Sequence, residues 1–123
     1  MTEQKTDLFA QVNAPKDPAN MTDLEKKHLP VITAPESVKT GGCFDVTVEV
    51  GKLLAHPNEH GHHIEFVDLY EDKVFLCRAD LSAVRTCPKV TFCVSINRGG
   101  ILRAFESCNL HGVWEGAHEI SVE

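Results

Sequence analysis

One short stretch of the chain is unusually rich in histidine. Within eight positions it contains four of the seven histidines: His56, His60, His62 and His63. Two distant segments add residues of related chemistry, because His28 follows a lysine pair and Cys108 precedes His111 by three positions. Imidazole nitrogen and thiolate sulfur suit zinc, iron, copper and nickel, whereas calcium and magnesium prefer oxygen. The residues therefore offer a transition-metal site, although a solvated polar loop would also explain the cluster, and ligand number alone does not exclude a four-ligand zinc site.

Most of the chain that must position these residues has the pattern of β-strands. From Phe44 to Val50, apolar side chains alternate with polar ones, which is typical of a strand with one buried face. Further strands are predicted at residues 63–70, 73–81, 89–96, 101–108 and 118–123. Residues 97–100 predict a hairpin turn, since glycine accepts the positive φ of such turns. About seven short strands joined by turns indicate an all-β, Ig-like antiparallel β-sandwich.

The first 30 residues differ from this pattern and predict a mostly irregular, partly helical segment. Residues 7–12 could form a short helix, and Thr22 is placed to cap a helical turn that runs through Lys27. Pro30 then ends the turn, because the residue before a proline is pushed toward an extended conformation. The 123 residues, of which 42% are hydrophobic, suit one domain. Within it we expect an N-terminal extension, residues 1–30, that carries the first metal-ligand loop, and a metal-binding sandwich, residues 31–123.

Charge and cysteine content narrow the functional classes. The formal net charge is -6 and the basic residues are dispersed apart from one pair, so we expect no nucleic-acid partner. No apolar run has the length of a signal peptide or of a membrane span. The five cysteines form no CxxC pair, and their odd number argues against a disulfide framework and fits a reducing compartment. We therefore expect a cytoplasmic protein without a membrane partner.

Three motifs resemble the superoxide reductases of the desulfoferrodoxin and neelaredoxin family. They occur in the family's order from about residue 24 to the end of the chain: Lys27-His28-Leu29-Pro30-Val31-Ile32, then His56-Pro57-Asn58 through His62-His63-Ile64, then Cys108-Asn109-Leu110-His111-Gly112-Val113-Trp114-Glu115. The last motif is the most specific of the three, and the first is the weakest when taken alone.

The resemblance implies one iron ion per chain, cycling between Fe2+ and Fe3+ in a square-pyramidal site. The implied ligands are four equatorial imidazoles and one axial sulfur: His28, His56, His62, His111 and Cys108. The sixth position, opposite the sulfur, would be open to solvent. Backbone N–H groups near Asn109 and Leu110 would hydrogen-bond the sulfur and tune its donation to the metal. Trp114 would form part of the wall that shields the imidazoles.

The implied reaction is the one-electron reduction of superoxide to hydrogen peroxide, without release of oxygen. Lys27 stands at the position of the family's catalytic lysine, where it would attract the anion and help to deliver protons. The chain departs from the family at Lys26, which replaces a glutamate that closes the sixth position of the oxidised iron. Glu25 lies one residue too early, so either Glu25 or solvent would take that position.

The resemblance also implies partners. A small redox protein such as a rubredoxin would donate the electron, and the single-iron members of the family form homo-oligomers such as tetramers. The first 30 residues contain no cysteine, so we expect the single-iron form rather than the longer form with a rubredoxin-like domain.

Two other interpretations stay open. The chain could be a non-catalytic module with zinc or nickel in a closed site, or an Ig-like interaction domain whose histidines are incidental. Some cysteines and histidines stand outside the implied ligand set. We expect Cys43, Cys77 and Cys93 to be core residues of strands, Cys87 to lie in a loop, His60 to be exposed, His63 to orient the site or to be exposed, and His118 not to bind the metal.

Overall fold

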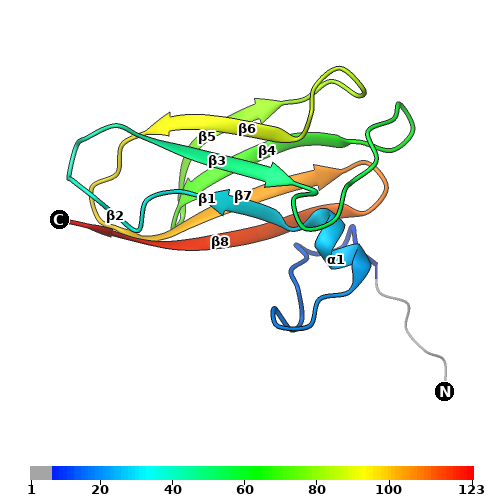
Figure 1. Ribbon diagram of the computed structural model, residues 1–123, viewed down its shortest axis with the longest axis horizontal. Coiled ribbons are helices and arrows are strands. Elements are labelled where there is room, and N and C mark those ends of the chain that lie inside the picture. Colours follow the sequence, from blue (N-terminus) through cyan, green and yellow to red (C-terminus); the bar gives the residue numbers. More distant parts are fainter. Residues whose placement is uncertain (1–6) are drawn as a thin grey trace.

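Two β-sheets packed face to face make up most of the molecule (Figure 1). The computed structural model describes residues 7–123. This described part contains one helix and eight strands: α1 (Asp23–His28), β1 (Pro30–Thr33), β2 (Ser37–Val38), β3 (Phe44–Val50), β4 (Ile64–Glu71), β5 (Val74–Asp80), β6 (Lys89–Val94), β7 (Gly100–Cys108) and β8 (Gly112–Val122). One sheet has the strand order β1-β3-β6 and the other the order β2-β8-β7-β4-β5. The all-β sandwich predicted from the sequence is confirmed.

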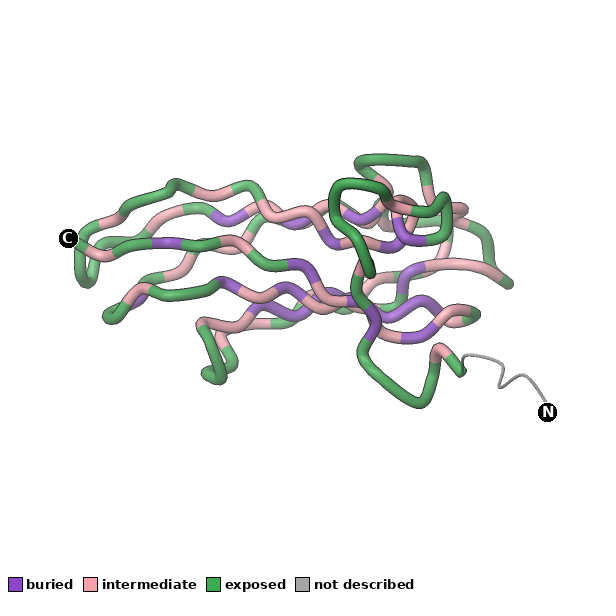
Figure 2. The backbone as a smooth tube through the Cα atoms, turned by 90° about the horizontal axis from the view of Figure 1, so that it is seen from below, coloured by how far each residue is buried: buried purple, intermediate pink, exposed green. Residues whose placement is uncertain are grey.

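The hydrophobic core lies between the two sheets. In β3 the side chains of Val46, Val48 and Val50 are buried, while the polar residues between them face outward. The five-stranded sheet adds Leu69 from β4 and Leu102 from β7, both fully buried. Buried positions accordingly run along the strands, and the exposed ones gather in the connecting loops (Figure 2).

The prediction of a hairpin at residues 97–100 was wrong. Gly99 and Gly100 do have positive φ values of 73° and 126°, but the turn leads from β6 in one sheet to β7 in the other. The partner of β6 is β3. A tight hairpin instead joins β7 to β8, and Cys108 pairs with Gly112 at its closed end. This hairpin is what places Cys108 and His111 beside each other.

The N-terminal part and the last strand differ from the prediction in detail. Residues 7–12 form turns instead of a helix, and the carboxylate of Asp7 accepts a hydrogen bond from the backbone N–H of Phe9. The predicted turn ending at Lys27 is helix α1. Strand β8 begins six residues earlier than predicted and also pairs with β2 in parallel, so its sheet is mixed. No helix among residues 7–123 is long and apolar enough to cross a membrane.

The two sheets approach each other closely where β1 crosses β8. A Cβ atom added to Gly116 in β8 would lie 2.0 Å from the backbone oxygen of Pro30 in β1. Only a residue without a side chain fits there, and Pro30 lies two positions after His28. The contact therefore fixes the start of β1 against β8, and with it the end of α1 that carries His28.

We predict that Gly116→Ala lowers the free energy of unfolding by about 1–3 kcal/mol, because the methyl group must push β1 away from β8. Denaturant unfolding of the purified protein measures this difference. Gly61→Ala is the matched control, since a Cβ atom there meets nothing within 4 Å. Equal stability of the two variants would contradict the account of this contact.

Candidate metal centre

Helix α1 positions His28 at one end of the sandwich. Its first turn is held by a capping box, in which the hydroxyl of Thr22 accepts from the N–H of Glu25 at 3.2 Å and the carboxylate of Glu25 accepts from the N–H of Thr22 at 2.8 Å. The helix ends where Leu29 becomes extended before Pro30. His28 is 1% exposed, and its Nδ1–H donates to the backbone oxygen of Leu24 at 2.7 Å. This bond leaves Nε2 as the free nitrogen of the ring.

The loop between β3 and β4 supplies His56 and His62. Its path is set by Asn58, whose side chain accepts from the N–H of Val84 at 2.8 Å and donates to the oxygen of Thr86 at 3.2 Å. Two backbone hydrogen bonds between Glu59 and His62, of 2.9 and 3.1 Å, close a tight turn. The Nδ1–H of His56 donates to the backbone oxygen of Pro57 at 2.6 Å, so Nε2 of His56 is again the free nitrogen.

The β7–β8 hairpin supplies Cys108 and His111. Cys108 is fully buried at the end of β7, and His111 lies in the turn. The indole N–H of Trp114 donates to the backbone oxygen of His111 at 3.0 Å. The same indole stacks on the ring of His28, with 5.2 Å between centroids and 25° between planes. Trp114 therefore joins the hairpin to α1.

Four imidazole rings from these three segments form a closed circuit. The centroid distances are 4.8 Å from His28 to His56, 4.7 Å from His56 to His62, 5.2 Å from His62 to His111 and 4.8 Å from His111 to His28. The sulfur of Cys108 lies 3.4 Å from Nε2 of His56 and 3.7 Å from Nδ1 of His111. The ligand atoms of His28, His56, His62 and Cys108 lie within 4.8 Å of one another. All five residues singled out in the sequence are brought together.

Burial favours the neutral form of three of the imidazoles. Burial lowers the pKa of His28 and of His56 to about 4 in each case, and it also lowers the pKa of His111. At neutral pH each of these rings therefore has a lone pair available for a metal. Burial raises the pKa of Cys108, whereas hydrogen bonds from the backbone N–H groups of Leu110 and His111 lower it. These donors would stabilise a thiolate.

The second-sphere donors agree only in part with the sequence prediction. Leu110 contributes an N–H to the sulfur as expected, and the second N–H comes from His111. The N–H of Asn109 donates instead to the backbone oxygen of His63 at 3.2 Å.

Two nitrogen atoms of the centre are buried without a hydrogen-bond partner in the described protein. They are Nε2 of His28 and Nε2 of His62. A buried polar atom left unpaired costs about 1–3 kcal/mol, so such atoms are normally satisfied by something. Imidazole nitrogens and one sulfur that converge on a common point suit a transition-metal cation. The residues present therefore fit a metal ion.

Two charged residues next to His28 have different surroundings. The positive charge of Lys27 contributes to lowering the pKa of His28 and of His111. The carboxylate of Glu25 is engaged in hydrogen bonds to backbone groups. Its two carboxylate oxygens accept from the N–H groups of Thr22 and Lys16, and these hydrogen bonds lower its pKa.

Asn109 is a structural residue of the centre that the sequence reasoning missed. Its side-chain amide donates to the oxygen of Gly61 at 2.9 Å and accepts from the N–H of His63 at 2.8 Å. The amide thus fastens the histidine loop to the β7–β8 hairpin. Only the position of asparagine directly after Cys108 could have suggested this role.

Several further cysteines and histidines stand outside the ligand group. The core prediction was wrong for Cys43 and Cys93, which are exposed, and Cys77 is only partly buried. His60 is exposed as expected. His118 contacts the backbone oxygen of Pro35 at 3.2 Å and is not part of the ligand group.

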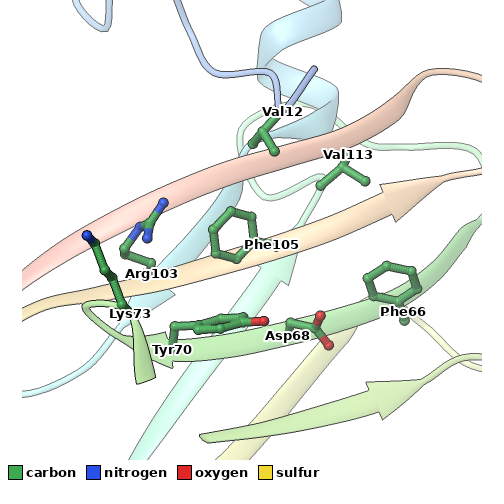
Figure 3. A pocket seen from close by; sticks show the side chains of 8 residues that line it. All are labelled: Val12, Phe66, Asp68, Tyr70, Lys73, Arg103, Phe105 and Val113. Atoms are coloured by element: carbon green, nitrogen blue, oxygen red, sulfur yellow. The ribbon is translucent and has the colours of Figure 1, made fainter. Parts of the chain in front are cut away.

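A separate hollow lies on the outer face of the five-stranded sheet (Figure 3). Its aromatic floor consists of Phe66, Tyr70 and Phe105, and Lys73 and Arg103 stand at one end. None of the candidate ligands lines it. This hollow therefore does not belong to the metal centre.

Comparison with known proteins gives a consistent result. A family model described as Desulfoferrodoxin matches residues 20–117. The chain is 36% identical to a superoxide reductase of Pyrococcus abyssi, covering 80% of this chain and 89% of the relative, and 32% identical to a neelaredoxin of Megalodesulfovibrio gigas, with the same coverage. A solved superoxide reductase (neelaredoxin) from Ignicoccus hospitalis superposes with a TM-score of 0.72 at 42% identity, covering 78% of this chain and 81% of that one.

We predict that Asn109→Ala weakens metal binding by about 10–100-fold, because the histidine loop is no longer fastened to the hairpin. Competition with a chelator of known affinity measures the change. Asn97→Ala, at an exposed turn outside the centre, is the control and should bind metal as the unaltered chain does. Equal affinity of both variants would contradict the role given to Asn109.

Proposed function

This chain belongs to the desulfoferrodoxin family and is a superoxide reductase, and we propose that it acts through a single iron ion bound by His28, His56, His62, His111 and Cys108. The observation that carries this proposal is the closed circuit of four imidazoles with one buried sulfur beside it. A closed zinc or nickel site would need only four of these ligands. The convergence of five donors therefore favours iron over the non-catalytic alternative.

The reaction combines superoxide with one electron and two protons to give hydrogen peroxide. When bound, the iron supplies the electron. His28 and His56 would bind it in their neutral form, because burial disfavours their protonation. The N–H groups of Leu110 and His111 stabilise the negative charge of the Cys108 sulfur, whose donation to the metal they would tune.

Lys27 is the proposed catalytic residue. The substrate is an anion, whereas the protein has a formal net charge of -6, so a local positive charge must guide the substrate to the centre. Lys27 and Lys26 lie in the last turn of α1, and the charge of Lys27 acts on two of the four rings. The ammonium of Lys27 would also donate protons to the product through water.

We propose that solvent, and not a carboxylate, takes the sixth position of the oxidised iron. Lys26 offers no carboxylate, and both oxygens of Glu25 are engaged by backbone N–H groups. Release of Glu25 would break the capping box that holds α1 and His28 in place. Because losing these hydrogen bonds would destabilise α1, we propose that Glu25 stays in the capping box and leaves the sixth position of the iron to solvent.

The remaining features of the proposal rest on family likeness. We propose that the chain binds one iron ion and receives its electron from a rubredoxin-like protein. We further propose a homo-oligomer such as a tetramer and a cytoplasmic location. Residues 1–30 would act as an extension that carries the first ligand, and residues 31–123 would form the iron-binding sandwich.

We predict that the oxidised, iron-loaded protein has a visible absorption band from charge transfer between the Cys108 thiolate and iron. It should consume superoxide only when a reductant is supplied. Cys108→Ser should lose the band, whereas Cys87→Ser should keep it, since Cys87 is exposed and outside the ligand group. A colourless protein with one tightly bound zinc would contradict the proposal.

We predict that Lys27→Ala slows the reaction with superoxide by about 10-fold at low ionic strength and weakens its dependence on salt, because the local attraction is lost. Pulse radiolysis measures the rate at several salt concentrations. Lys26→Ala, which removes the same charge from the neighbouring position, should have a smaller effect. Equal effects of both variants would show that only net charge matters.

A further inference from the structure

Two cysteines that the fold leaves at the surface lie on one face of the three-stranded sheet. Strands β3 and β6 pair with Asp45 opposite Cys93 and Thr47 opposite Thr91. The hydroxyl oxygens of Thr47 and Thr91 lie 2.8 Å apart, so the two side chains share one face of the sheet. This face points outward, because Val46 and Val48 are buried on the opposite face. Cys43 lies two positions before Asp45 and therefore on the same face. Both cysteines are exposed.

The thiols of Cys43 and Cys93 are neighbours. Cys43 stands diagonally across from Cys93 in the register of β3 and β6, because Asp45 is the residue directly opposite Cys93. Side chains on such a diagonal are within reach of each other. Cys43 is also among the neighbouring groups that raise the pKa of the Cys93 thiol.

The backbone beside the pair can adjust to the geometry that a sulfur–sulfur bond requires. Cys43 precedes the first residue of β3, so no strand pairing restrains it. It follows Gly41 and Gly42, and a Cβ atom on Gly41 would meet nothing within 4 Å. A small shift of this segment is therefore permitted, whereas Cys93 is held within β6.

The pair is remote from the metal centre. Strand β3 begins near the C-terminal end of the sandwich and runs toward α1, so Cys43 lies at the end opposite His28 (Figure 1). Neither cysteine belongs to the ligand group. A chemical change at the pair can therefore occur without replacing a metal ligand.

We propose that Cys43 and Cys93 are a dithiol site that hydrogen peroxide converts to a reversible intramolecular disulfide. The thiolate of Cys43 attacks one oxygen of the peroxide, the O–O bond breaks, and a sulfenic acid and hydroxide form. The thiol of Cys93 then attacks the sulfenic sulfur, the sulfur–sulfur bond forms, and the sulfenic oxygen leaves as water. In total, two thiols give up two electrons and two protons, and one peroxide becomes two molecules of water.

The surroundings of Cys93 support the second role in this sequence. Desolvation, the neighbouring Cys43 and the carboxylate of Asp45 all raise the pKa of the Cys93 thiol. A raised pKa makes the Cys93 thiol a poor first nucleophile, because the thiolate is the form that attacks peroxide. A partner so close captures a sulfenic acid before further peroxide converts it to the irreversible sulfinic form.

The site adds a function to the proposed one. The product of superoxide reduction is hydrogen peroxide, which the dithiol would consume while it records exposure of the protein to the oxidant. The inference can be tested independently of the iron reaction, because peroxide can be added directly. A negative result for the dithiol site therefore does not affect the proposed iron reaction, and the reverse also holds.

The test treats the reduced, metal-loaded full chain with hydrogen peroxide and maps the linked peptides by mass spectrometry without reductant. We expect a peptide pair joined through Cys43 and Cys93, the loss of two titratable thiols per chain, and recovery of both thiols with dithiothreitol. Cys87→Ser, which removes an exposed thiol elsewhere, should behave in the same way. Cys43→Ser and Cys93→Ser should each lack the link while consuming superoxide at the unaltered rate.

Three results would overturn the inference. The first is that Cys43 and Cys93 stay reduced at peroxide concentrations that oxidise Cys87. The second is conversion of each thiol to a sulfinic acid without a link, and the third is a disulfide only to other chains. Loss of superoxide consumption with an intact Cys43–Cys93 link would instead count against the proposed function alone.

Discussion

The constraint on which the structure depends is the burial of imidazole nitrogens that have no partner of their own. Nε2 of His28 and Nε2 of His62 are removed from water and bound to nothing else in the described protein. Atoms of this kind are destabilising unless a cation satisfies them. Folding and metal binding are thereby linked, because only the folded chain brings the donors together. The capping box, the amide of Asn109 and the close approach at Gly116 all stabilise that convergence.

The centre also depends on a division of charge. Burial favours neutral rings at His28, His56 and His111, backbone N–H groups favour a negative sulfur, and the positive charge of Lys27 acts on the rings of His28 and His111. An acidic protein can in this way attract a small anion to one place. Glu25, the carboxylate next to this region, is committed to helix capping, which leaves the centre without a negative side chain from α1.

The sequence predicted which side chains come together better than it predicted the connections between strands. Residue type, spacing and family likeness were enough to single out five residues that converge in the fold, and alternation identified β3. The hairpin at residues 97–100 was misjudged because glycines mark a turn but do not say which sheet the next strand joins. Strand β8 was missed at its start because two of its buried positions, Gly112 and Gly116, have no apolar side chain. The role of Asn109 depends on two segments that meet only in the fold. Cys93 could have been placed correctly, since it alternates with inward-facing Phe92 and Val94.

X-ray absorption at the metal edge of the purified protein tests the central claim most directly. The edge identifies the element, and the fine structure counts the atoms bound to it. The account predicts iron with one sulfur at about 2.3 Å and four imidazole nitrogens at about 2.1 Å, taking zinc distances as a guide. A zinc edge, an absent sulfur shell or only three nitrogens would contradict the account.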